Sequence, residues 1–157
     1  MSSAATWAQR RSRHPIAAAV GRFLHLMAAD PGNPPALEAL IRLLDELAWL
    51  AHQIRREEIE HGDVAVETEP PDADWAASSR QAFAWVGHVR SEAREGRPQI
   101  DCPAVELSEI VDDLARIQWR FRSTSDGDAL FHYQLGFISH WGHHLRRVQQ
   151  ALHAWYW

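Results

Sequence analysis

The chain contains no lysine, because all 16 of its basic residues are arginines. This absence excludes Schiff-base formation, a lysine general base and the lysine of a phosphate-binding P-loop. The 157 residues include a single cysteine, Cys102, so an internal disulfide is excluded and a reducing compartment is expected. No apolar run approaches the roughly 20 residues that span a bilayer. We therefore expect a cytoplasmic protein without a membrane partner.

Catalytic motifs and an excess of positive charge are absent as well. The sequence has no Gly-x-Ser-x-Gly elbow, zinc-protease motif, glycine-rich phosphate loop or paired-cysteine metal motif. Its 16 basic and 21 acidic residues give a net charge of −5, which argues against a nucleic-acid partner. These absences favour a protein that is not an enzyme and that needs no cofactor.

What the chain does have is helical periodicity. Apolar residues recur at three- and four-residue steps, and proline- or glycine-containing segments interrupt them. Ser108 and Asp128 are expected to cap the last two helices. Residues 1–13 are expected to form a flexible basic tail, and residues 14–157 a single helical domain. The predicted fold is all-α, a single-domain bundle of about five helices, at 15–29, 35–61, 74–96, 108–121 and 129–155.

The last of these segments concentrates histidine and tryptophan. His140 and His144 are one helical turn apart, close to the face that the apolar residues define. Two histidines in this arrangement are typical of metal sites on H-x-x-x-H helices. A metal would need a third ligand, for which Glu58, or His52 at the rim, is the candidate on the second helix. Such a site would hold a divalent transition metal and could support a metal-dependent hydrolase or transferase.

A structural interpretation of the same histidines is also open, and we favour it. With ten histidines in the chain, one such pair arises readily by chance. Core imidazoles satisfy their nitrogens by hydrogen bonding to backbone or carboxylate groups of facing helices. Gly136 and Gly142 lie in the same predicted helix, where glycine usually permits the close approach of another helix.

Five of the eight tryptophans fall into two groups. Trp75, Trp141 and Trp155 follow the apolar stripes and are expected in the core. Trp49 and Trp119 lie nearly opposite the inward faces of their helices. An aromatic residue in that position packs against a further helix or waits for a partner, since exposed tryptophan is typical of interface hot spots. The partner would be another protein or, in a homo-oligomer, a second copy of this chain.

Two stretches carry a resemblance to a known family. The signature His140-Trp141-Gly142-x-His144, together with Leu-Ser-Glu-Ile-Val-Asp-Asp-Leu-Ala at 107–115, resembles the bacterial domain-of-unknown-function family 5063. The similarity covers about residues 104–153. That family has no established activity, so the resemblance implies a helical architecture and marks His140, Trp141 and His144 as the positions of interest.

Three functions follow from these patterns. The first is a non-catalytic helical bundle that acts through protein contacts, as an accessory, regulatory or immunity-type protein. The second is the metal-binding bundle with His140 and His144 as ligands. The third, more distant, is a ribonuclease of the HEPN class, which pairs an arginine with a nearby histidine; the candidate pairs are Arg56 with His61 and Arg147 with His153.

Overall fold

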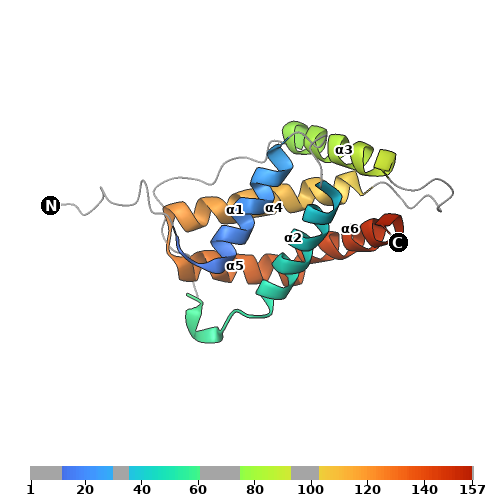
Figure 1. Ribbon diagram of the computed structural model, residues 1–157. Coiled ribbons are helices and arrows are strands. Elements are labelled where there is room, and N and C mark those ends of the chain that lie inside the picture. Colours follow the sequence, from blue (N-terminus) through green and yellow to red (C-terminus); the bar gives the residue numbers. More distant parts are fainter. Residues whose placement is uncertain (1–11, 30–35, 61–74, 93–102, 157) are drawn as a thin grey trace.

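The computed structural model describes residues 12–29, 36–60, 75–92 and 103–156. In these ranges the chain is all-helical and has no strand, which confirms the predicted fold class. Most of the expected tail, residues 1–11, lies outside the described residues. The described elements are six α-helices and one 3₁₀ helix: α1 (Pro15–Ala28), α2 (Ala36–Ala51), η1 (Arg56–Glu58), α3 (Trp75–Glu92), α4 (Ala104–Ser123), α5 (Asp126–Ser139) and α6 (Trp141–Tyr156) (Figure 1).

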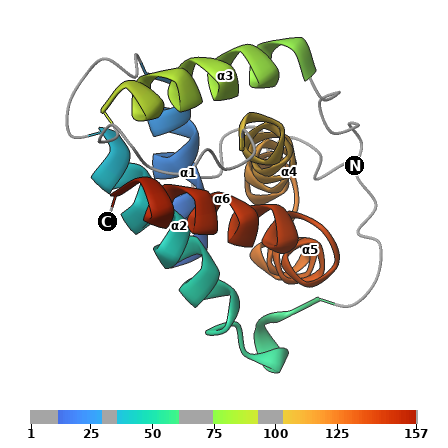
Figure 2. The same ribbon diagram turned by 90° about the vertical axis from the view of Figure 1, so that its right-hand side faces the viewer.

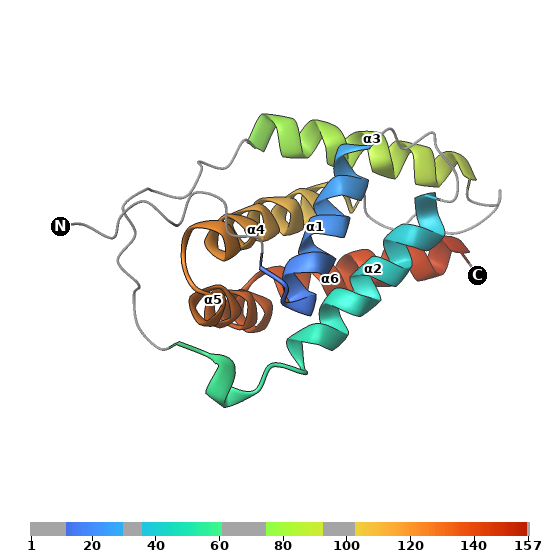
Figure 3. The ribbon, with the colours of Figure 1, turned by 60° about the vertical axis from the view of Figure 1, so that its left-hand side comes forward.

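Helix α4 is the centre of the arrangement, because α1, α3, α5 and α6 all pack against it. Helices α1 and α2 cross over the layer that α4, α5 and α6 form, and α3 lies along one side of this layer (Figures 1 and 3). Figure 2 shows α4 and α5 nearly end-on, with α6 between them and α2. No helix in the described part of the chain is both long and apolar enough to cross a lipid bilayer.

The buried apolar side chains form one core cluster to which all six helices contribute. Trp141 and Trp155 belong to it as predicted, whereas the side chain of Trp75 is outside the described residues. The polar tips of two buried aromatics are satisfied by backbone: the Trp85 indole N–H donates to the Met27 carbonyl at 3.1 Å, and the Tyr133 hydroxyl donates to the Leu47 carbonyl at 2.7 Å. Burial raises the pKa of Tyr133 far above its ordinary value, so this hydroxyl remains a donor.

Two predicted helix boundaries are wrong. Helix α2 ends at Ala51 rather than near residue 61, because the chain turns extended at Arg55, where the backbone N–H donates to the Glu58 carboxylate at 2.8 Å. Helix α4 begins at Ala104, four residues before the expected cap. Ser108 is therefore inside the helix, buried, and its hydroxyl donates to the Val105 carbonyl at 2.8 Å.

The predicted last helix is in fact two helices, so the described residues contain six α-helices rather than about five. Ser125, not Asp128, caps α5 by accepting the Asp128 backbone N–H at 3.1 Å. The helical backbone is interrupted at His140, whose φ of −144° and ψ of −87° lie outside the helical region. Helix α6 starts again at the next residue, and α5 and α6 pack against each other.

The two glycines around this break explain why the chain can turn so tightly. A Cβ atom on Gly142 would lie 2.0 Å from the Phe137 carbonyl oxygen, and one on Gly136 would lie 2.8 Å from the Trp141 indole. Both positions therefore require the absence of a side chain. The predicted close approach of a helix is present, but it joins the two parts of a segment that was expected to be continuous.

A Gly142→Ala substitution is expected to destabilise the fold, because its Cβ would meet backbone that cannot move away as a flexible side chain would. We expect the free energy of unfolding to fall by at least about 2 kcal/mol in urea titrations. The matched control is Gly87→Ala on α3, where nothing lies within 4 Å of the added Cβ and stability should rise by about 0.5–1 kcal/mol. Equal stability of the Gly142→Ala variant and the wild type would contradict this explanation of the break.

Candidate metal centre

A row of acidic residues on α4 faces a row of basic residues at the start of α6. The acids recur at three- and four-residue steps, so they share one stripe of α4, and the basic residues are spaced in the same way. Where the residue numbers increase along α4, the numbers of the residues that they contact decrease along the other row. This is the pattern of an antiparallel helix pair. The facing residues are Glu106, Glu109 and Asp113 on α4, and His140, His144 and Arg147 on the other side.

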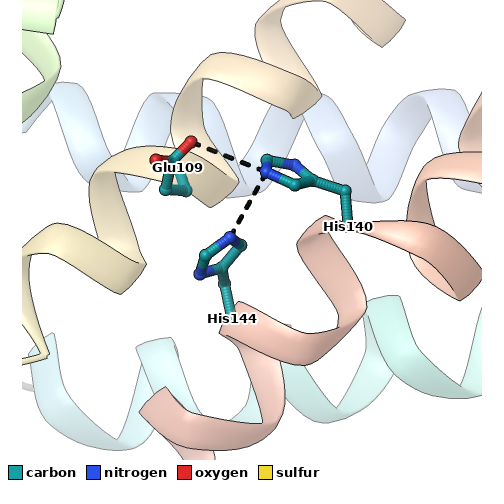
Figure 4. A group of neighbouring side chains, drawn as sticks. All are labelled: Glu109, His140 and His144. Carbon is teal, nitrogen blue, oxygen red and sulfur yellow. Dashed lines mark hydrogen bonds and ion pairs between the residues drawn. The ribbon is translucent and has the colours of Figure 1, made fainter.

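Each imidazole is oriented by a carboxylate that accepts from its Nδ1 atom. The His144 Nδ1 atom lies 2.5 Å from Glu106 Oε2, and the His140 Nδ1 atom lies 2.6 Å from Asp113 Oδ2. An ionised carboxylate can only accept, so both Nδ1 atoms carry hydrogen. Both Nε2 atoms consequently turn away from these carboxylates and toward each other, 3.4 Å apart, with Glu109 Oε2 4.0 Å from the His140 Nε2 atom (Figure 4).

The contact between the two Nε2 atoms has room for one proton. Because both Nδ1 atoms already carry hydrogen, a hydrogen bond between the two Nε2 atoms forms when one of the rings is an imidazolium. The hydrogen bond to Asp113 raises the pKa of His140 above its ordinary value, against partial burial and with help from the Asp113 and Glu109 charges. His140 is therefore the ring that donates, and a metal ion between the rings would displace this proton.

The distances fit a metal ion at the position of that proton. With metal–nitrogen bonds of about 2.0–2.1 Å and a tetrahedral angle, two ligand nitrogens lie about 3.4 Å apart, which is the observed Nε2–Nε2 separation. Together with the Glu109 carboxylate, the three ligand atoms lie within 4.8 Å of one another. Glu109 would need to approach by only about 1 Å to complete a two-histidine, one-carboxylate set.

Exposure and surroundings also suit a metal site. The side chain of His140 is 50% exposed, so an ion can enter from solvent, whereas His144 is only 19% exposed. Carboxylates on the Nδ1 atoms are the usual partners of metal-binding histidines, because they fix the ring orientation and increase the basicity of Nε2. Burial alone would raise the pKa of Glu106, but hydrogen bonds from His144 and Arg147 outweigh it and lower that pKa, so this carboxylate stays ionised near neutral pH.

The structure brings together two of the three predicted metal ligands. His140 and His144 meet as the spacing indicated, but Glu58 is elsewhere, in η1, where its carboxylate binds the backbone N–H and the guanidinium of Arg55. The other candidate, His52, packs edge-on against Phe137 with ring centroids 5.5 Å apart. Glu109 occupies the place of the missing third ligand.

Sequence reasoning missed Glu109 although a signal was present. None of the α4 acids is among the third-ligand candidates predicted from the sequence, which came from the second predicted helix. The spacing of the α4 acids, three and four residues, matches the spacing of the histidines and Arg147, and this match indicates two facing stripes. The carboxylate partners expected from the structural interpretation of the histidines are also present, so that interpretation remains the alternative to a metal site.

The other sequence-based candidates do not belong to the group of possible metal ligands. Trp49 is 60% exposed and lies on a pocket of about 360 Å³ that the start of α1 and the end of α2 line. Trp119 is partly buried, with the Arg120 guanidinium 5.9 Å from its ring centroid. Of the ribonuclease pairs, Arg147 is bound to Glu106 and His153 is exposed. The partner of Arg56, His61, is outside the described residues.

No family model, curated protein or solved structure matches this chain. The resemblance of residues 104–153 to the domain-of-unknown-function family therefore stays a prediction.

In the metal-free protein, His140 is expected to titrate above pH 6.5, because its hydrogen bond to Asp113 favours the charged ring. Its contribution to stability should be complete below pH 6.5 and be lost as the pH rises through the raised pKa. Long-range ¹H–¹⁵N NMR spectra measure this pKa directly. Asp113→Asn should bring the pKa down, whereas a wild-type value at or below 6.5 would contradict the geometry.

Proposed function

We propose that this protein binds a divalent transition metal between α4 and α6, with His140 Nε2, His144 Nε2 and the Glu109 carboxylate as ligands. One observation carries the proposal: two Nε2 atoms face each other at 3.4 Å while a carboxylate holds each Nδ1 atom. Imidazole and carboxylate ligands suit zinc, nickel or iron. The net charge around the site also favours a cation. Three carboxylates and two nearby arginines, Arg116 and Arg147, make the site negative when both rings are neutral.

A set of three protein ligands is typical of catalytic rather than structural metal sites. Structural zinc sites are closed by four protein ligands, whereas catalytic sites keep a position for water or substrate. A metal with an open position polarises a carbonyl or phosphoryl group and lowers the pKa of water. The half-exposed His140 leaves this position accessible, so the site supports metal-dependent hydrolysis better than a purely structural role.

Zinc titration of the metal-free protein tests the proposal. We expect one zinc ion per chain, and a loss of affinity of more than about a hundredfold in His144→Ala and in His140→Ala, because each removes a ligand. Asp113→Asn, which removes the negative charge beside the His140 Nδ1 atom and leaves the ligands in place, should cost about tenfold. Isothermal titration calorimetry gives these affinities, and circular dichroism verifies that each variant remains helical.

The matched control is His143→Ala, which removes an exposed histidine of the same helix that is not part of the ligand group. Its affinity for zinc should equal that of the wild type. If His143→Ala and His144→Ala lose the same affinity, or neither loses any, the bound zinc is not at this site. The two histidines would then be part of a structural ion-pair row between α4 and α6.

The exposure of Trp49 supports a second candidate function, binding of a protein partner. A tryptophan that is 60% exposed beside an apolar pocket has the chemistry of an interface hot spot. Trp49→Ala should change the free energy of unfolding by less than about 0.5 kcal/mol, because the side chain is mostly in solvent. In affinity pull-downs this variant should lose a partner that wild type and Trp119→Ala both retain. If all three proteins retain the same partners, Trp49 is not part of a binding interface.

A further inference from the structure

A cavity of about 280 Å³ opens between α4 and α5, directly beside the proposed metal site. We call it the α4–α5 pocket. It shares Asp113 with the metal site, and its lining includes Trp141, the residue after His140. The polar groups that line it are Asp113, Arg116, Arg120, His132, Ser139 and the Trp141 indole.

The Trp141 indole N–H is a buried donor without an acceptor. The side chain is fully buried, and its Nε1 atom has no hydrogen-bond partner among the described residues. A buried donor that is left unpaired is costly, and it is uncommon in native proteins. Trp85 shows the ordinary solution in the same core, since its indole donates to the Met27 carbonyl. The unpaired N–H at the pocket wall therefore leaves a place for an acceptor from outside the chain.

The charges around the pocket favour an anion as that acceptor. The Arg116 guanidinium is exposed, and no described residue forms an ion pair or a hydrogen bond with it. The Arg120 Nη1 atom donates a hydrogen bond to the Asp128 carboxylate at 2.9 Å. The carboxylate that lines the pocket, Asp113, has its Oδ2 atom hydrogen-bonded to the His140 ring. Donors thus outnumber free acceptors at the pocket, and guanidinium with indole N–H is a suitable pair for a planar oxyanion.

The remaining wall is apolar and sets the size of the ligand. Ile117 and Leu135 line the pocket beside these donors. A volume of about 280 Å³ is close to the lower end of small-molecule sites and is too small for a macromolecular segment with side chains. An apolar wall next to a donor pair suits a molecule with a hydrocarbon body and one acidic group.

We propose that the α4–α5 pocket binds a small organic carboxylate, whose oxygens accept hydrogen bonds from the Trp141 indole N–H and the Arg116 guanidinium. Binding itself does not require the metal. Because Asp113 joins the two sites, a carboxylate in this pocket lies next to the proposed metal position. This assigns small carboxylic acids as the substrate class, a step that rests on the proposed function.

The indole resonance of Trp141 provides a direct test with benzoate as the probe. In ¹H–¹⁵N spectra of metal-free protein, the peak that disappears in Trp141→Phe identifies this N–H. We expect benzoate to shift it downfield in a saturable way, and benzamide, which has the same shape without the charge, to leave it unchanged. Arg116→Gln should weaken benzoate binding by about tenfold, because one charge-assisted hydrogen bond is lost. Arg122→Gln, an exposed arginine of α4 outside the pocket, is the control and should bind as wild type.

The outcomes separate this proposal from the metal site. No saturable shift up to about 50 mM benzoate, a weak affinity for a specific site, would overturn the pocket assignment, as would equal binding of benzamide. Inorganic phosphate that binds as tightly as benzoate would overturn the organic carboxylate and leave a general anion site. If zinc binds and benzoate does not, only the pocket proposal is overturned. If benzoate binds and zinc does not, the metal centre is overturned and, with it, the substrate role of the carboxylate.

Discussion

The pairing of the acidic stripe of α4 with the start of α6 is the interaction on which the site depends. Asp113 and Glu106 hold the two imidazoles by their Nδ1 atoms, and this alone decides that the Nε2 atoms converge. The interruption of the helical backbone at His140 makes the pairing possible, because α6 begins there as a separate helix. Trp141 fixes that start by packing edge-on against Tyr133 and Phe137, with ring centroids 4.9 and 5.0 Å away.

These charged contacts position side chains more than they stabilise the fold, because ion pairs contribute less free energy than apolar burial does. Ion pairs that are partly exposed to solvent contribute about 0–1 kcal/mol, and His140 and Arg147 are 50% and 67% exposed. The burial of Trp141, Tyr133 and their neighbours contributes far more, at about 1.5–3 kcal/mol for each large apolar side chain. Because these side chains contribute little to the stability of the fold, they can bind a ligand without a large loss of stability. The neighbouring pocket has the same character, since the buried Trp141 indole N–H at its wall has no hydrogen-bond partner among the described residues.

Much of the fold could be predicted from the sequence, because helical periodicity and proline-rich interruptions are local signals. The pair His140 and His144 could be predicted for the same reason. The break between them could not, since one non-helical residue barely changes the phase of the apolar stripe, and glycine on both sides fits a packed helix equally well. The third ligand was missed because Glu109 meets the histidines only when α4 and α6 are placed side by side. Glu58 has a suitable phase on an ideal helix, but the chain turns at Arg55 before reaching it.

The central claim is that two imidazoles and one carboxylate converge on a single metal ion. X-ray absorption spectroscopy of the one-to-one zinc complex tests this most directly, because the scattering pattern counts the imidazole ligands. The account predicts nitrogen and oxygen neighbours at about 2.0–2.1 Å, two imidazoles in the wild type and one in His144→Ala. Fewer than two imidazoles in the wild type, or a sulfur neighbour at about 2.3 Å, would contradict it.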